Sequence, residues 1–167
     1  MASATPQKLN KSSKKIIICS VENPYHSSYI DLIHQEYAVK NTEFNKNKKT
    51  VGYQTITTNS IFLHLSHSSC SYIADYACSL LNSDYTTVNC WGVHYMPNFE
   101  FDRHDHAGYD YTFVYYVSVP ENSPIIFDDF LYIPKDRDLI VFPASLHHWV
   151  EPVPHDRYII AGNLKHL

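Results

Sequence analysis

The sequence lacks the features that mark several large classes of protein. No run of 18 apolar residues occurs, so no segment is expected to span a membrane. The net charge is −4, the pI is about 6.2, and no basic stripe of the kind that binds a phosphate backbone is present. Nucleic acid is therefore not an expected partner. Short lysine clusters at 11–15 and 46–49 are interpreted as solvated surface.

The cysteines are few and form no CxxC pair. They are Cys19, Cys70, Cys78 and Cys90. Two of them lie in apolar runs, which is typical of reduced, buried thiols in a cytosolic protein. The polar N-terminus has no apolar core of a signal peptide. We therefore expect a cytoplasmic protein.

The length of 167 residues fits one domain with a real core and is too short for two comfortable ones. We expect residues 1–14 to form a flexible tail and residues 15–167 to form the single domain. No internal repeat or low-complexity segment interrupts that domain.

The first half of the chain predicts two helices. An apolar, β-branched strand over Lys15–Val21 precedes a helix over Ser27–Asn41, where aromatic and aliphatic residues recur four positions apart. A loop and a weak strand, Val51–Thr57, lead to a second helix over Ser69–Leu81 with one apolar face. Both helices are expected to pack against the outside of a sheet.

The second half predicts short strands broken by Pro, Asn, Asp and Gly. The expected strands are Thr86–Met96, Tyr111–Val119, Pro124–Ile133, Leu139–Phe142 and Arg157–Asn163. Such spacing is typical of a sandwich or barrel. Helices followed by strands indicate an α+β fold that is mainly β, with the helices covering one face.

Histidine is abundant, and three of its eleven positions suggest a metal site. His104 and His106 lie two apart, so on a strand they would project from the same face roughly 7 Å apart. His148, just past the strand Leu139–Phe142, could supply a third ligand. Two close ligands and one distant ligand would make a three-point site with three open positions on an octahedral metal. Asp102 shares the face of the pair and is an alternative to His106.

Arg157 opens the last strand and shares a face with residues 159, 161 and 163. An unpaired arginine inside an apolar barrel would cost several kcal/mol, so it needs an anion. A dicarboxylate that binds the metal at one end and the guanidinium at the other would satisfy both groups. The alternatives are an arginine outside the barrel or an ion pair with one of three aspartates, Asp102, Asp110 or Asp128.

Three stretches of the second half form a joint pattern. They are Trp91 to His106, ending His104-Asp-His106-Ala; Val114-Tyr-Tyr-Val-Ser-Val-Pro120-Glu-Asn-Ser-Pro-Ile-Ile-Phe127; and Phe142-Pro-Ala-Ser-Leu-His-His148-Trp-Val-Glu-Pro152, followed by Asp156-Arg157 and Asn163. This pattern resembles the 2-oxoglutarate/iron(II)-dependent oxygenases common in marine bacteria and phages, over about 75 residues. The chain departs from it at Thr112-Phe113, where the family usually has Ser-Gly, and at Val93 and Ala144.

The resemblance implies a double-stranded β-helix, a jelly-roll and cupin-like fold, buttressed by the two helices. It implies Fe(II) and 2-oxoglutarate as cofactors and an oxidoreductase that hydroxylates a protein side chain or a small metabolite. The implied metal ligands are His104, His106 and His148. Arg157 would bind the far carboxylate of 2-oxoglutarate, and Asn163 and Tyr116 are further candidates for the co-substrate site.

Two other functions fit the same pattern. A cupin-type enzyme with three histidines would need no 2-oxoglutarate, and a non-catalytic binding module would use its metal structurally or not at all. Turnover of 2-oxoglutarate to succinate and metal analysis separate these readings. A homodimer is compatible with the sequence.

Overall fold

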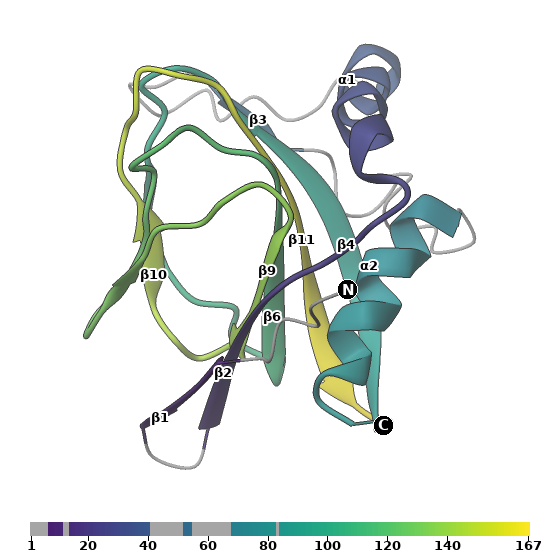
Figure 1. Ribbon diagram of the computed structural model, residues 1–167, viewed down its shortest axis with the longest axis vertical. Coiled ribbons are helices and arrows are strands. Elements are labelled where there is room, and N and C mark those ends of the chain that lie inside the picture. The colour runs from purple at the N-terminus through teal and green to yellow at the C-terminus, as the bar shows by residue number, and fades with distance from the viewer. Residues whose placement is uncertain (1–6, 12–13, 41–51, 55–67, 83) are drawn as a thin grey trace.

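The computed structural model describes residues 7–11, 14–40, 52–54, 68–82 and 84–167. Two antiparallel sheets face each other, and two helices lie on the outer side of the larger sheet (Figure 1). The larger sheet has the order β1-β2-β9-β6-β11-β4-β3, and the smaller has the order β5-β10-β7-β8. Within the larger sheet, β11 lies between β6 and β4, and β11 and β4 pair along almost their whole length.

The elements have the following bounds. The strands are β1 (Gln7–Lys11), β2 (Lys14–Ser20), β3 (Gly52–Gln54), β4 (Tyr85–Tyr95), β5 (Phe101–His104), β6 (Tyr111–Ser118), β7 (Ile125–Phe127), β8 (Leu131–Tyr132), β9 (Asp138–Pro143), β10 (His148–Val150) and β11 (Arg157–His166). The helical elements are a 3-10 turn η1 (His26–Ser28), α1 (Tyr29–Lys40) and α2 (Ser68–Ser79).

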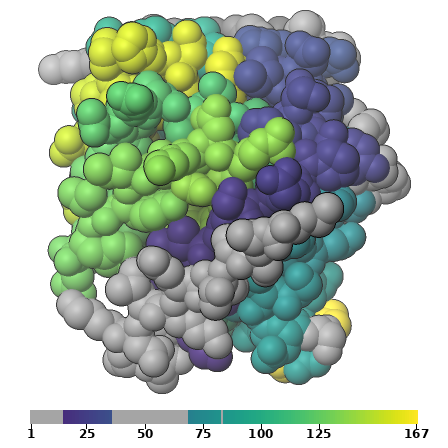
Figure 2. All heavy atoms as spheres, viewed as in Figure 1, coloured from purple at the N-terminus to yellow at the C-terminus, as the bar shows by residue number. Residues whose placement is uncertain are grey.

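The helices bury one apolar face each against the larger sheet. Tyr29 and Ile33 of α1, four residues apart, are fully buried, and so are Ile73 and Ala77 of α2. These side chains belong to one core cluster with the helix-facing residues of the sheet. In the space-filling view the purple and teal helices lie on the side away from the green strands that follow residue 100 (Figure 2). The two predicted helices are confirmed, with the first beginning as a 3-10 turn.

The central strands of the larger sheet, β6, β9 and most of β11, are buried on both faces. In β6, Phe113 and Tyr115 join the cluster under the helices, whereas Val114 and Tyr116 join a second cluster between the two sheets. Alternate side chains of a strand point to opposite faces, so a strand covered on both sides is apolar throughout. The architecture is a double-stranded β-helix, and the predicted α+β, mainly β fold is confirmed.

The structure corrects three boundaries. Gln7–Lys11 pairs with β2 as an added strand, so the predicted tail over residues 1–14 is wrong for this segment and for Lys14. The expected strand Pro124–Ile133 is a hairpin of β7 and β8, closed by a bond from the Phe127 N–H to the Phe130 carbonyl at 2.8 Å. The predicted loop at 41–50 lies outside the described residues, and of the weak strand 51–57 only Gly52–Gln54 is described.

All four cysteines are free thiols; Cys19, Cys70 and Cys90 are buried and Cys78 is half-buried, as expected. Among the helices of the described segments, none combines the length and the hydropathy that crossing a bilayer requires.

Candidate metal centre

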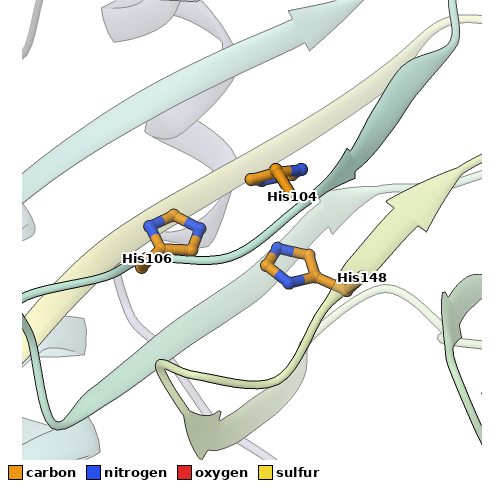
Figure 3. A group of neighbouring side chains, drawn as sticks. All are labelled: His104, His106 and His148. Atoms are coloured by element: carbon orange, nitrogen blue, oxygen red, sulfur yellow. The ribbon is translucent and has the colours of Figure 1, made fainter.

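Three histidines, located on the smaller sheet or just after one of its strands, have their side chains at one point. His104 ends β5, His148 begins β10, and these two residues are direct partners across the β5–β10 ladder. His106 lies in the turn just past β5, which is fixed by a bond from its backbone N–H to the carbonyl of Ala144 at 2.8 Å. The possible ligand atoms of the three side chains lie within 4.8 Å of one another, and Figure 3 shows the three rings around a common space.

The structure differs from the sequence expectation in where the pair lies. His106 was expected on the same strand as His104, but β5 ends at His104 and the turn brings His106 back to the cluster. Asp102, the alternative ligand, is exposed and is not part of the cluster. His147 lies outside it as well, 3.7 Å from Asp105 on the outer surface. The described residues therefore offer an all-histidine site.

Hydrogen bonds orient two of the rings. The Nδ1 atom of His104 lies 2.8 Å from the carbonyl oxygen of Asp102, and that of His148 lies 3.0 Å from the carbonyl oxygen of Leu146. A carbonyl only accepts, so Nδ1 must carry the proton and Nε2 must carry the lone pair in both neutral rings. Both rings are thus held in the tautomer that a metal ligand needs.

The environment also keeps two of the three rings, His106 and His148, uncharged. Burial, with repulsion from His104, lowers the pKa of His106 to about 4 and that of His148 to about 3. Taking an imidazolium out of water is costly, and neighbouring imidazolium charges repel. Both rings are neutral at physiological pH, and neutral imidazole is the form that binds metals.

The cluster opens into a cavity of about 280 Å³ between the two sheets. Inward-facing residues of β4, β6 and β11 form most of its wall. Apolar side chains such as Trp91, Val114 and Ile159 line its middle, and Arg157 lies at the end opposite Asn163 on β11. The cavity therefore combines a potential cation site with a buried cation.

Arg157 is 3 % exposed and has no carboxylate partner among the described residues. Its guanidinium donates to Ser123 Oγ at 2.9 Å and to the carbonyls of Glu151 at 3.1 Å and Phe99 at 3.3 Å. Its Nε has no hydrogen-bond partner within the described segments. The centre of the guanidinium lies 4.9 Å from the centre of the Tyr95 ring. Burial lowers the pKa of Arg157, so the charge is poorly compensated within the protein.

The ion-pair alternatives for Arg157 are wrong. Asp128 makes two bonds to Arg103, at 2.7 and 2.8 Å, on the outer surface. Asp102 and Asp110 are exposed, and neither forms an ion pair with Arg157. The alternative of an arginine outside the barrel is also wrong, because Arg157 is buried and lines the cavity.

The other two candidate residues also line the cavity. Tyr116 is 5 % exposed, and burial raises the pKa of its phenol, which stays protonated and can donate a hydrogen bond. Asn163 is 3 % exposed, accepts a bond from Thr112 Oγ1 and donates one to Asn89 Oδ1, each at 2.9 Å. Tyr116 thus lines the cavity with a phenol that can donate, whereas Asn163 is held within a network of protein side chains.

Sequence reasoning missed the residues that surround the candidates. Tyr95 pairs directly with Arg157 in the β4–β11 ladder, and Asn89 pairs with Asn163 in the same ladder. The period-2 pattern of the expected strand over 86–96 places Asn89 and Tyr95 on one face, which could have indicated a shared role. No comparable signal marks Ser123, which follows β6 in a loop.

Comparison with solved structures shows what this arrangement is similar to. The viral collagen prolyl hydroxylase of Paramecium bursaria Chlorella virus-1, in a 2-oxoglutarate complex, superposes with a TM-score of 0.66 at 13% identity, covering 91% of this chain and 96% of that one. The prolyl hydroxylase of Trichoplax adhaerens, in complex with a hypoxia inducible factor peptide, superposes with a TM-score of 0.63 at 14% identity. The match covers 89% of this chain and 83% of that one. HygX of Streptomyces hygroscopicus, with nickel and 2-oxoglutarate bound, superposes with a TM-score of 0.64 at 9% identity. The match covers 90% of this chain and 82% of that one.

No family model matches the sequence, and no curated protein matches it significantly. At identities this low, the likeness to solved structures establishes the fold. The chain has the double-stranded β-helix shared by these 2-oxoglutarate-bound proteins, and the resemblance inferred from the sequence is confirmed at this level.

Proposed function

We propose that the protein is an Fe(II)- and 2-oxoglutarate-dependent dioxygenase that hydroxylates a protein side chain or a small metabolite. One observation carries the proposal: three imidazoles that meet at one point and a buried guanidinium with no carboxylate partner among the described residues line the same cavity. The first group fits a divalent metal with open positions, and the second fits the far end of a dicarboxylate.

The donor set fits Fe(II). His104, His106 and His148 would hold the metal through imidazole nitrogens, which suit iron among the first-row metals. Three neutral ligands leave the metal with its full charge of +2, which favours an anionic co-substrate such as the 2-oxoglutarate dianion. When bound, the iron and its co-substrate supply the oxidative chemistry, in which 2-oxoglutarate gives succinate and carbon dioxide.

The remaining residues would bind and orient the co-substrate. Arg157 would form a charge-assisted fork to the far carboxylate, which also gives its Nε an acceptor within reach. Tyr116, whose phenol stays protonated, would donate a second hydrogen bond to that carboxylate. The apolar wall of Trp91, Val114 and Ile159 would exclude water and strengthen these interactions.

The solved neighbours support this assignment without setting the substrate. HygX is described with nickel and 2-oxoglutarate, and the viral prolyl hydroxylase is described with 2-oxoglutarate. The Trichoplax enzyme is described with a peptide, which is compatible with a protein substrate here. Cytoplasmic localisation, a homodimer and the assignment of residues 15–167 to one domain stay predictions.

The test uses the full chain freed of metal with a chelator. We expect one equivalent of Fe(II) to bind under nitrogen, 2-oxoglutarate to raise the melting temperature of the iron-loaded protein, and admission of air to give succinate. Metal binding without any response to 2-oxoglutarate would instead identify a cupin-type enzyme. A protein that binds no metal, or that holds zinc with no open position, would identify a binding module.

A further inference from the structure

The three histidines of the cluster are held by different contacts. The Nδ1 atoms of His104 and His148 lie 2.8 and 3.0 Å from backbone carbonyl oxygens two residues earlier. The ring of His106 stacks on the indole of Trp91: the ring centroids are 5.9 Å apart, and the two planes differ by 24°. Within the described segments, Trp91 is the aromatic residue outside the cluster that contacts this ring. The contact joins the turn after β5 to β4 of the larger sheet.

The indole of Trp91 is a firmly held part of the cavity wall. It is 6 % exposed and belongs to the core cluster between the two sheets. Trp91 lies in the middle of β4, and β4 pairs with β11 on both sides of this position. Its neighbours two positions away, Asn89 and Val93, line the same cavity, as the alternation of a strand requires. A buried indole on a strand paired in this way can act as a fixed support for a neighbouring ring.

The backbone around His106 is fixed, but this does not set the plane of its ring. The His106 N–H donates to the Ala144 carbonyl at 2.8 Å, and the His106 carbonyl accepts from the Tyr109 N–H at 3.3 Å. Rotation of a histidine ring about the Cβ–Cγ bond has only broad, roughly two-fold preferences. The ring plane therefore depends on what packs against its faces. Besides Trp91, the nearly parallel ring of His148 lies 5.2 Å away, with 6° between the planes.

The plane of the ring matters because the lone pair of an imidazole nitrogen lies in it. A metal ion binds in that plane, at the edge of the ring, and a ring that turns its face toward the ion cannot bind it. Contacts that fix the orientation of a ligating side chain therefore contribute to metal affinity. In the structure the possible ligand atom of His106 already lies within 4.8 Å of those of His104 and His148.

We propose that Trp91 is a positioning residue for His106: by stacking on the imidazole it fixes the ring plane, so that the ring edge faces the space shared with His104 and His148. The proposal rests on the metal site of the proposed function. It gives Trp91 a role beyond that of an apolar wall residue. The larger sheet would then contribute to the metal site through an aromatic side chain, although the ligands belong to the smaller sheet and the turn beside it.

The primary test measures the Co(II) affinity of the full chain by competitive titration. A stacked aromatic pair is worth roughly 2- to 13-fold in an equilibrium constant. We expect Trp91→Leu to weaken Co(II) binding by an amount in this range, because the ring must then be ordered when the metal binds. Trp91→Phe keeps a ring that can stack and should restore most of the affinity.

Val93→Ala is the matched control for packing, because it truncates another cavity-facing side chain of β4 that has no ring to stack. It should bind Co(II) as the wild type does. Equal affinity in the wild type and Trp91→Leu would overturn the proposal. An equal loss in Val93→Ala and Trp91→Leu would overturn it as well, since packing of the cavity wall would then explain both.

A second measurement asks whether Trp91 acts through the imidazole. His106→Asp keeps a possible ligand at this position and removes the ring. In this background Trp91→Leu should leave the Co(II) affinity unchanged, because the two substitutions remove the same interaction. A further loss as large as in the wild-type background would contradict the proposal. If His106→Asp binds Co(II) too weakly to titrate, the comparison of Trp91→Leu with Trp91→Phe decides alone.

The contact itself is read in the metal-free full chain by NMR. The ring current of the indole acts on protons close to it, so the carbon-bound ring protons of His106 should change their shifts in Trp91→Leu. Those of His104 should change less. The His106→Gln variant assigns the signals. Unchanged His106 shifts in Trp91→Leu would show that the two rings do not stack, and the positioning role would then be wrong.

The two proposals fail in different ways. If the wild type binds neither Co(II) nor Fe(II), the proposed function is wrong and the positioning role falls with it, whatever the ring protons show. If the wild type binds metal and Trp91→Leu binds it equally well, the positioning role is wrong and the proposed function stands. Should Trp91→Leu not fold, Trp91→Met removes the ring and keeps more of the buried volume.

Discussion

The two faces of the central strands differ in what their side chains do. On the face toward the helices, Phe113, Ile160 and Leu164 are fully buried and closely packed. Gly162 shows how close this packing is, because a Cβ there would lie 2.5 Å from the Phe113 ring and 2.7 Å from the Asn89 carbonyl oxygen. The opposite face of the same strands borders a cavity and carries polar groups.

The cavity face places its polar groups at the ends of an apolar middle. Along β11, Arg157 and Asn163 bracket Ile159 and Ala161, and all four line the cavity. The polar groups at both ends are buried, with Arg157 poorly compensated. Alternate residues of one strand thus have different roles. The residues on the helix side stabilise the fold, whereas those on the cavity side form a site whose buried polar groups lower the stability of the fold.

The largest expected effect tests the cavity side. His148→Ala should abolish Fe(II) or Co(II) binding in titrations, because it removes a ligand and leaves only two imidazoles. Chemical denaturation should show little loss in the stability of the metal-free protein, since a ring that is costly to bury next to two others is removed. A variant that still binds metal at full strength would mean that the cluster is not the site.

The next largest effect tests the helix side. Phe113→Ala should reduce the free energy of unfolding by about 3–5 kcal/mol, because it empties a fully buried site under the helices. Urea unfolding measures the change. Co(II) affinity at temperatures where the variant is folded should stay near that of the wild type. A large loss of affinity in the folded variant would break the separation between the two faces.

A third variant tests whether the buried guanidinium of Arg157 binds 2-oxoglutarate. Arg157→Met should weaken 2-oxoglutarate binding to the metal-loaded protein by about 2–5 kcal/mol, or roughly 30- to 4000-fold, as expected when one partner of a buried charge pair is removed. Isothermal titration calorimetry measures this loss. Arg137→Met, which removes a half-exposed arginine, should leave the affinity unchanged. Equal affinity in the wild type and Arg157→Met would show that another group binds the co-substrate.

The smallest effect concerns pH. The folded protein holds the pKa of His106 near 4 and that of His148 near 3, whereas an unfolded histidine titrates near 6.5. Between these values the unfolded chain binds more protons, so the metal-free protein should lose stability as pH falls below about 6.5. The contribution of each ring is at most about 1.4 kcal/mol per pH unit.

Comparison with a variant isolates this contribution, because burial also lowers the pKa of His26 and His94. Urea unfolding at a series of pH values should give a shallower dependence for His148→Ala than for the wild type over the range from about 4 to about 6.5. Parallel curves for the two proteins would mean that His148 is not held neutral by the fold.

Much of the fold follows from local patterns. The helix over Tyr29–Lys40 and the long strand over Arg157–His166 were predictable because burial on one or both faces imposes a periodicity that is visible in the sequence. The three-residue strands β7 and β10 are too short for any periodicity, and the added strand Gln7–Lys11 depends on pairing with β2. These elements exist because of their partners.

The same division holds for the candidate site. Residue type and spacing were enough to select His104, His106, His148 and Arg157. They could not exclude Asp102 as a ligand or an aspartate as the partner of Arg157, because both questions depend on which groups approach one another in space.

By itself, the sequence determined the chemistry that the chain can present: imidazoles two residues apart, a third beyond a strand, and an arginine in an apolar run. The tertiary structure alone decided that His104 and His148 are cross-strand partners and that Arg157 is buried beside Tyr95 and Ser123, with no carboxylate partner in the described part of the chain. The physical reason is that local sequence sets each residue's type and the face it occupies, whereas pairing between distant strands sets which faces meet.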